Sequence, residues 1–221
     1  MVIRTNAPVA VSVSLESGDH LTRDEFHRRY LERPDIKKAE LIDGVVIVAS
    51  PVRREHGRPH GFVMGWLAAY VAQHPATELL DNTTVFLDGK VEVQPDALLW
   101  RPEPGGPRLT DDGYILGAPQ LVVEVAASSV SYDLHSKKEA YRRNGVREYV
   151  VWRVQNQAID WFHLEGGQYM AVQPDAAGLI ESAQFPGLKL DVPNMLAGNL
   201  AAVLAHLSAP AGHDQESGSP S

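Results

Sequence analysis

The chain has no cysteine among its 221 residues. This absence excludes disulfides, thiolate catalysis and any zinc or iron–sulfur site held by cysteine, and it suits a reducing compartment. The sequence also lacks an apolar run of the roughly 20 residues that span a bilayer. Its N-terminus lacks a basic segment followed by a long apolar core. We therefore expect a cytoplasmic protein that is not bound to a membrane.

Repeats and internal linkers are also absent from the sequence. A length of 221 residues with 44% hydrophobic content suits one well-buried domain rather than two. We expect an N-terminal arm over residues 1–21, a single domain over residues 22–207 and a disordered tail over residues 208–221.

Acidic residues outnumber basic ones, and the formal net charge is -8. Such a charge argues against a polyanionic partner, because nucleic-acid-binding proteins usually display a basic surface. The basic residues are concentrated, however: residues 22–60 and 133–153 contain 15 of the 20 Lys and Arg but 10 of the 28 Asp and Glu. These segments could form two basic surfaces on an acidic body, or their side chains could simply solvate the outer face of a helix.

The hydrophobic pattern alternates between helical and strand-like segments. Thr22 and Glu25 form a capping-box pattern at the start of a helix. The dipeptides Asp43-Gly44 and Gly166-Gly167 are typical of hairpin turns. The pattern predicts helices over residues 22–32, 60–74, 133–144 and 193–207, and strands within residues 39–51, 83–88, 91–100, 120–126, 148–154 and 158–173. We therefore predict a layered α/β or α+β domain in which helices flank a mixed central β-sheet.

Asp96 and Glu124 each interrupt a run of apolar residues within a predicted strand. A buried charge is unfavourable without compensation, and a divalent cation is the simplest compensating partner. If the two strands are neighbours, both side chains can reach one ion. Carboxylate oxygens suit Mg²⁺ or Mn²⁺, with water completing the coordination. We therefore predict that Asp96 and Glu124 are metal ligands.

Lys137 lies on the same predicted helix face as Asp133 and Tyr141, because the three are spaced four residues apart. This face can direct the lysine ammonium toward the two carboxylates. The ammonium could orient the attacking water or stabilise charge on a phosphoryl oxygen, while the metal lowers the pKa of that water. Two acids, a lysine and a metal together indicate hydrolysis of phosphodiesters.

Several short elements follow one another between residues 22 and 195. They are Glu40 to Gly44, Ser50-Pro51 with His56, Pro95-Asp96, Glu124-Val125, Asp133 with Lys137 and Tyr141, Gly145-Val146, and Glu148-Tyr149. In this order they resemble the Uma-type restriction endonuclease family of the PD-(D/E)XK nuclease superfamily. The resemblance implies a restriction-endonuclease-like core, with Asp96 and Glu124 as magnesium ligands and DNA as the substrate.

Two further residues of these elements, Glu40 and His56, are candidates for catalysis. Glu40 matches the early acid of the family and could act as a third carboxylate, or it could pair with Lys37 or Lys38. His56 could contact phosphate or assist proton transfer, since an unperturbed histidine has a pKa of about 6.5.

His56 and His60 have a spacing that superficially resembles a zinc motif. Gly57 and Pro59 argue against a continuous helix at this point, so we discount zinc. The surrounding arginines suit contacts with a DNA backbone. They are Arg53, Arg54 and Arg58.

The sequence departs from the usual superfamily pattern at one position. A lysine normally stands two residues after the second acid, but Ala126 occupies this place after Glu124. Lys137 would then be a catalytic lysine supplied by the following helix. Lys138 is the alternative, although helix geometry turns it about 100° away.

These features predict a magnesium-dependent endonuclease that hydrolyses DNA. One alternative is a catalytically inactive module that keeps the nuclease fold and binds nucleic acid or another partner. A second is an acidic enzyme that acts on small phosphoesters. Cutting of both DNA strands would favour a symmetric homodimer.

Overall fold

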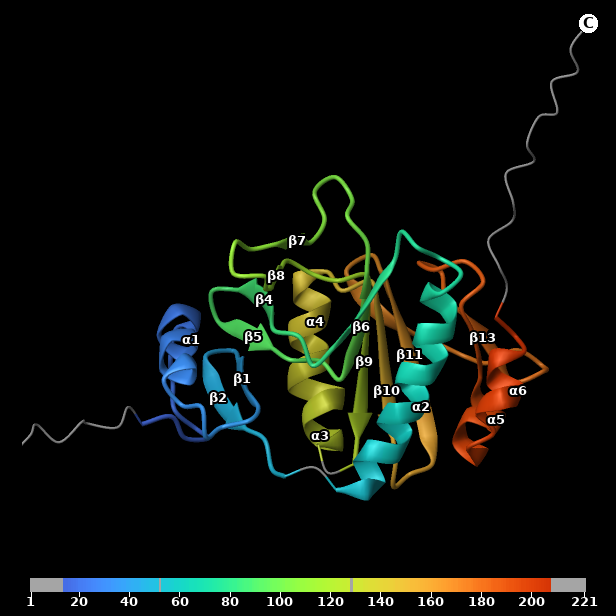
Figure 1. Cartoon of the computed structure of the whole chain (residues 1–221), viewed down its shortest axis with the longest axis horizontal. Coiled ribbons are helices and arrows are strands. Elements are labelled where there is room, and N and C mark those ends of the chain that lie inside the picture. The colour runs from blue at the N-terminus through green and yellow to red at the C-terminus, as the bar shows by residue number, and fades with distance from the viewer. Residues whose placement is uncertain (1–13, 52, 128, 208–221) are drawn as a thin grey trace, which may run out of the picture.

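The computed structural model describes residues 14–51, 53–127 and 129–207. Two six-stranded β-sheets and the helices around them form a layered α/β structure. Figure 1 shows these layers side by side, from the N-terminal helix at one end to the C-terminal helices at the other. The predicted fold class is confirmed, with the strands divided between two large sheets.

The first sheet is built mainly from the N-terminal half of the chain. Its strands are β1 (Ala39–Ile42), β2 (Val45–Val48), β4 (Val85–Asp88), β5 (Val91–Val93), β7 (Arg108–Leu109) and β8 (Ile115–Leu116). Their order is β2-β1-β5-β4-β8-β7, and β4 and β8 run parallel. The helix α1 (Arg23–Leu31) packs on this sheet through Phe26, which joins Leu41 and Val46 in a small core.

The second sheet crosses the middle of the molecule. Its strands are β3 (Glu78–Asp81), β6 (Ala97–Trp100), β9 (Leu121–Ala126), β10 (Glu148–Arg153), β11 (Ala158–Glu165) and β12 (Gln168–Val172). Their order is β12-β11-β10-β9-β6-β3, and only β9 and β10 are parallel neighbours. Strands β13 (Leu179–Glu181) and β14 (Lys189–Asp191) form a separate pair.

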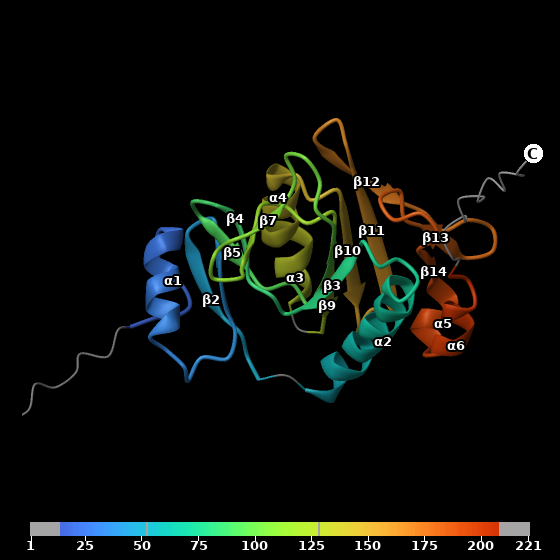
Figure 2. The same ribbon diagram turned by 45° about the horizontal axis from the view of Figure 1, so that its top comes forward.

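A helical segment lies between the two large sheets (Figure 2). It consists of α3 (Val130–Tyr132), the π-helix η1 (Asp133–Lys137) and α4 (Lys138–Asn144). The segment ends at Gly145, whose φ of 86° provides a left-handed cap. Ala140 and Tyr141 of α4 pack with Val85 of the first sheet and Val122 of the second. This shared core joins the sheets.

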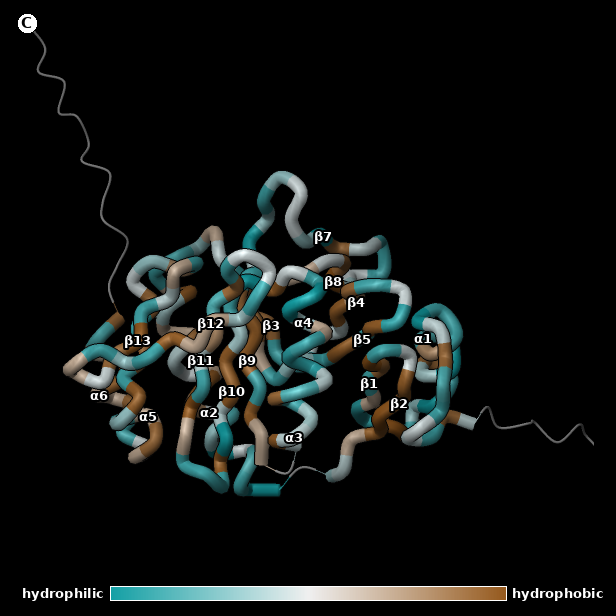
Figure 3. The backbone as a smooth tube through the Cα atoms, turned by 180° about the vertical axis from the view of Figure 1, so that it is seen from behind, coloured by the Kyte–Doolittle hydropathy of each residue, from teal (hydrophilic) through white to brown (hydrophobic). Residues whose placement is uncertain are grey.

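Three helices cover the opposite face of the second sheet: α2 (Arg54–Val71), α5 (Val192–Ala197) and α6 (Leu200–Leu204). Trp66 of α2 packs in their core with Val123, Trp161 and Met195. Figure 3 shows β9 and β10 as hydrophobic stretches through the middle of the molecule. Both faces of these strands are therefore covered, which explains their nearly continuous apolar sequences.

Several local predictions are confirmed. The hydroxyl of Thr22 accepts a hydrogen bond from the backbone N–H of Glu25 and caps α1. Asp43 and Gly44 both have positive φ, 54° and 79°, and join β1 to β2. The turn at Gly166-Gly167 likewise joins β11 to β12.

Residues 91–100 do not form one strand, contrary to the prediction. They form β5 and β6, which belong to different sheets. Pro95 has no N–H to donate to a ladder, so the chain leaves the first sheet after Val93 and enters the second at Ala97. Asp96 therefore lies at the junction between the sheets rather than inside a strand.

The helix α2 begins earlier than predicted and includes both Gly57 and Pro59. Pro59 removes one backbone hydrogen bond, but the apolar face of this 18-residue helix, with Trp66, packs on the second sheet and stabilises it. The prediction of an interrupted helix was wrong. As a consequence His56 and His60 stack on one helix face, with ring centroids 5.8 Å apart.

The predicted closing helix is interrupted by one glycine. Gly198 has a φ of 78° and ends α5, and Asn199 then caps α6 by accepting from the N–H of Ala202. Because a left-handed residue cannot continue a right-handed helix, the single predicted helix becomes two short ones.

Part of the predicted N-terminal arm packs on the first sheet. Leu15 is buried, and His20 forms an isolated bridge with Val45. Residues 1–13 and the predicted tail over residues 208–221 lie outside the described residues. None of the helices in the described ranges is long and apolar enough to cross a membrane.

Candidate active site

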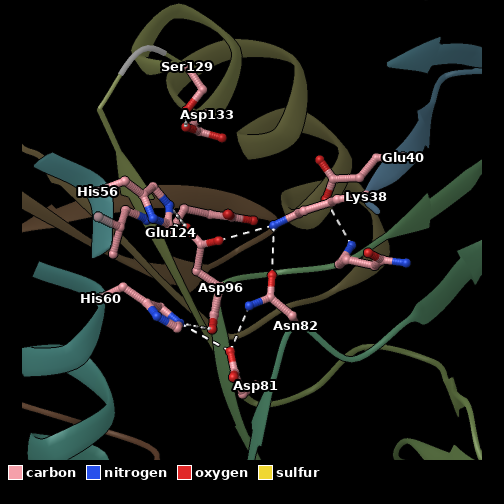
Figure 4. Close-up of polar contacts among 12 residues, drawn as sticks. Lys38, Glu40, His56, His60, Asp81, Asn82, Asp96, Glu124, Ser129 and Asp133 are labelled. Carbon is pink, nitrogen blue, oxygen red and sulfur yellow. Dashed lines mark hydrogen bonds and ion pairs between the residues drawn. The ribbon is translucent and has the colours of Figure 1, made fainter. Parts of the chain in front are cut away.

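The carboxylates of Asp96 and Glu124 meet where the two sheets adjoin. Ala97 of β6 pairs with Val123 of the antiparallel strand β9, which places Asp96 opposite Glu124. Both residues are buried, and Figure 4 shows their carboxylates side by side. The structure thus brings together the two acids that the sequence singled out.

Asp96 is held from three directions. Its Oδ1 accepts from Nζ of Lys38 at 3.0 Å, and its Oδ2 accepts from the N–H of Val125 at 2.8 Å. Nε2 of His56 lies 3.1 Å from Oδ2. Burial alone would raise the pKa of Asp96, but the hydrogen bond of His56 and the charge of Lys38 hold that pKa well below its usual range. Asp96 is therefore an ionised carboxylate at neutral pH.

Glu124 has a different set of partners. Its Oε1 accepts from Nζ of Lys137 and from the hydroxyl of Tyr141, both at 2.8 Å. Within the described residues, no hydrogen bond reaches its Oε2. Burial raises the pKa of Glu124, the charge of Lys137 lowers it, and the carboxylate of Asp96 raises it further. A nearby cation would favour the ionised form.

Lys137 lies at the centre of three carboxylates. Its Nζ is 2.8 Å from Glu124, 2.9 Å from Glu40 and 3.8 Å from Asp133. Asp133 also accepts from the hydroxyl of Ser129 at 2.5 Å. Burial lowers the pKa of Lys137, but the charges of Glu124 and Glu40 raise it well above its usual value. Lys137 is therefore a permanent cation within the cluster.

Glu40 joins this cluster from the first sheet. Its Oε2 pairs with Lys137, and its Oε1 accepts from the N–H of Gln94 at 2.8 Å. Of the partners considered from the sequence, Lys38 pairs instead with Asp96. Glu40 therefore places a third carboxylate within reach of the central lysine.

Two histidines of α2 flank Asp96 (Figure 4). His56 faces the carboxylate, and its Nδ1 is buried without a hydrogen-bond partner among the described residues. Nε2 of His60 lies 2.9 Å from the backbone oxygen of Asp96 and 3.1 Å from Oδ1 of Asp81. No group of three or more His, Cys, Asp or Glu in the described part of the chain has the geometry of a metal site. Both histidines therefore contact Asp96 from one face of α2.

The charge of the cluster fits a hard divalent cation. Counted as ionised, its four carboxylates outnumber its two ammonium groups by two negative charges. Mg²⁺ often binds through one or two carboxylates and keeps several waters, so a pair of acids is a sufficient protein donor set. The charged members are Glu40, Asp96, Glu124, Asp133, Lys38 and Lys137.

Two participants, Lys38 and Asn82, were not predicted from the sequence, and they interact at 3.1 Å beside Asp96. The hydroxyl of Tyr141 reaches Glu124. The spacing of Tyr141 from Lys137 was a usable signal, because both lie on one helix face. Lys138 lies elsewhere, with Nζ 3.5 Å from the centroid of the Phe162 ring. Helix geometry therefore distinguished correctly between the two adjacent lysines.

The N-cap and first turns of α2 carry the three arginines noted in the sequence. All are exposed, and they surround His56 along the chain. Arg58 also lies over the ring of Phe62, at 5.0 Å from its centroid. A basic, solvent-facing segment therefore adjoins the acidic cluster. Its members are Arg53, Arg54 and Arg58.

The layered sheets and the paired acids define a restriction-endonuclease-like fold. The chain belongs to the Uma2 family, whose model, described as "Putative restriction endonuclease", matches residues 23–193. Among solved structures, the chain is similar to a putative nuclease belonging to DUF820 from Anabaena variabilis ATCC 29413, with a TM-score of 0.57 and 14% identity over 77% of this chain and 96% of that chain. This likeness shows a shared fold. No curated protein matches the chain.

Proposed function

We propose that the protein is a metal-dependent endonuclease that hydrolyses phosphodiester bonds in DNA. Its membership of the Uma2 family supports nuclease activity. The observation that carries the proposal is the apposition of Asp96 and Glu124 within a cluster that has excess negative charge. Two buried carboxylates that face each other raise each other's pKa, and a cation between them would allow both to be ionised.

Asp96 and Glu124 would hold Mg²⁺ or Mn²⁺, which would lower the pKa of a bound water and offset charge on the phosphate. Asp96 is ionised, and Oε2 of Glu124 makes no hydrogen bond within the described residues. Lys137 and Tyr141 fix the other oxygen of Glu124. These contacts would keep the donor oxygens in position before the substrate arrives.

Hydrolysis forms a bond between a water oxygen and phosphorus and breaks one P–O ester bond. The attacking water loses a proton, and the departing oxygen gains one. His56 is the candidate proton carrier, because its ring faces Asp96 and its side chain is part-exposed. Asp96 would orient the ring through the 3.1 Å contact to Nε2.

Arg53, Arg54 and Arg58 would contact the DNA backbone beside the site. They are exposed at the N-cap and in the first turns of α2, and such contacts position a duplex without reading its sequence. Cleavage of both strands would require two active sites, as in a symmetric homodimer.

Nicking of supercoiled plasmid tests the proposal directly. The wild type should nick DNA with Mg²⁺ or Mn²⁺ and not with EDTA. Asp96→Asn and Glu124→Gln should each lower the rate by more than about 100-fold, because both remove a metal ligand. Glu148→Gln is the matched control, since it changes a buried glutamate of the neighbouring strand. Equal nicking by all four proteins would reject the proposed site.

Two other outcomes would identify the alternatives. Binding of DNA without cleavage, with every metal tested, would favour an inactive module with a nuclease fold. Hydrolysis of a small phosphodiester without DNA binding would favour an enzyme for small substrates.

A further inference from the structure

Two lysines contact the acidic cluster, but they differ in exposure. The side chain of Lys137 is 4% exposed, whereas that of Lys38 is 23% exposed. A side chain that binds an incoming phosphate has to be reachable from solvent. Exposure therefore distinguishes the two lysines in a way that the sequence pattern does not.

Carboxylates enclose the ammonium of Lys137. It donates a hydrogen bond to Glu124 at 2.8 Å and forms ion pairs with Glu40 at 2.9 Å and with Asp133 at 3.8 Å. Turning Lys137 toward a phosphate would leave Glu40 and Glu124 as buried, unpaired charges, which is strongly unfavourable. Lys137 is thus best suited to hold the carboxylates in place.

Lys38 has a more open environment beside Asp96. It lies just before β1 and donates to Oδ1 of Asp96 at 3.0 Å and to Oδ1 of Asn82 at 3.1 Å. These are its two hydrogen bonds within the described residues, so one N–H remains for a ligand. Its flexible four-carbon stem also allows the ammonium to move between ligands.

On the basis of the proposed nuclease function, we infer that Lys38 binds a non-bridging oxygen of the scissile phosphate. Lys137 is then a buried positioning residue. Lys38 contacts Asp96, which would ligate the metal, so a phosphate bound at the metal would lie within reach of its ammonium. The neutral amide of Asn82 would steady the ammonium without cancelling its charge.

Binding of a fluorescent duplex oligonucleotide tests this inference without relying on cleavage. Ca²⁺ would replace Mg²⁺, because it also takes oxygen ligands. Loss of one phosphate contact should lower the slope of log affinity against log salt by about 0.9 in Lys38→Met. Lys38→Arg should keep the slope. Lys37→Met is the matched control, because Lys37 is the adjacent, exposed lysine.

Single-turnover cleavage gives the second measurement. Lys38→Met should lower the rate by roughly 100-fold or more, because it removes a charge that stabilises the transition state. Lys38→Arg should recover part of that rate, and Lys37→Met should cut like the wild type. Lys38→Met also removes an ammonium paired with the buried Asp96, so cleavage is compared well below the Tm of this variant, where it is folded.

The inference is overturned if Lys38→Met binds and cuts like the wild type, or if Lys37→Met weakens binding equally. Failure of the folded, charge-conserving Lys38→Arg to keep the salt slope would also overturn it. If the wild type binds DNA without cutting, the nuclease proposal fails, but the binding comparison still decides the phosphate contact of Lys38. If the wild type neither binds nor cuts, both proposals fail.

Discussion

Two buried glutamates on adjacent strands of the second sheet make an instructive comparison. Glu124 of β9 is 2% exposed and Glu148 of β10 is 1% exposed. Burial raises the pKa of each. Glu124 lies between Val123 and Val125 inside β9, whereas Glu148 begins β10 directly after Arg147, and their partners differ as well.

Glu148 is satisfied by neutral groups of one loop. It accepts from the hydroxyl of Ser182 and from the N–H of Ala183 at 2.9 Å. No lysine or arginine pairs with it among the described residues. Glu124 instead shares Lys137 with Glu40 and lies beside Asp96.

The comparison shows that burial alone does not identify a catalytic carboxylate. A single buried acid can anchor a loop when hydrogen bonds replace its lost water. Several acids that outnumber nearby cations need either an additional positive charge or protonation of one of them. The excess of carboxylates over ammonium groups distinguishes the surroundings of Glu124 from those of Glu148.

The largest expected effect on stability comes from Lys137→Met. Removing this cation leaves Glu40 and Glu124 buried without their partner, so the free energy of unfolding should fall by about 3–5 kcal/mol. Lys138→Met is the matched control and should lose at most about 1 kcal/mol, the contribution of its contact with the Phe162 ring. Urea unfolding of both variants measures the difference. Similar losses of unfolding free energy in the two variants would contradict the described cluster.

A smaller effect is expected from Glu148→Ala. The hydroxyl of Ser182 and the N–H of Ala183 would lose their acceptor, which should lower the free energy of unfolding by about 1–3 kcal/mol. Cleavage, measured well below the Tm, should be unchanged. Loss of cleavage in the folded variant would remove the proposed distinction between the two glutamates.

The smallest expected effect is a dependence of stability on pH. Burial raises the folded-state pKa of Glu148 above 4.5, although its hydrogen bonds to Ser182 and Ala183 oppose this. Because the pKa is higher in the folded state, the protonated carboxyl stabilises the folded protein relative to the unfolded one. This contribution to stability is lost as the pH rises through the folded-state pKa. The wild type should therefore lose stability relative to Glu148→Gln as the pH rises from about 4, near the ordinary pKa of a glutamate. Urea unfolding of both proteins at increasing pH tests the direction of this change. A difference in unfolding free energy that does not vary with pH would contradict the prediction.

The sequence was sufficient to predict which acids meet. Asp96 and Glu124 interrupt apolar runs on segments that prove to be neighbours, and the spacing of Lys137 and Tyr141 placed both on the face that meets Glu124. That prediction succeeded although η1 is a π-helix rather than an α-helix. Residues four apart still lie on nearly the same face of the segment, although the turn of the π-helix is wider than that of an α-helix.

The remaining contacts depend on how distant segments pack. Lys38 meets Asp96 across 58 positions and Asn82 across 44, and no local pattern encodes these separations. The division of residues 91–100 between two sheets was also missed, although Pro95 was a visible signal. The sequence singled out Glu124, which lies between two valines, but the partners of Glu148 were not predicted, because the loop that satisfies it lies far along the chain.

Calorimetric titration with Mn²⁺ or Mg²⁺ tests the central claim most directly. The wild type and Glu148→Gln should bind the ion with equal affinity, whereas Glu124→Gln and Asp96→Asn should bind it at least about tenfold more weakly. Equal affinity in all four proteins would show that the opposed carboxylates do not form a metal site.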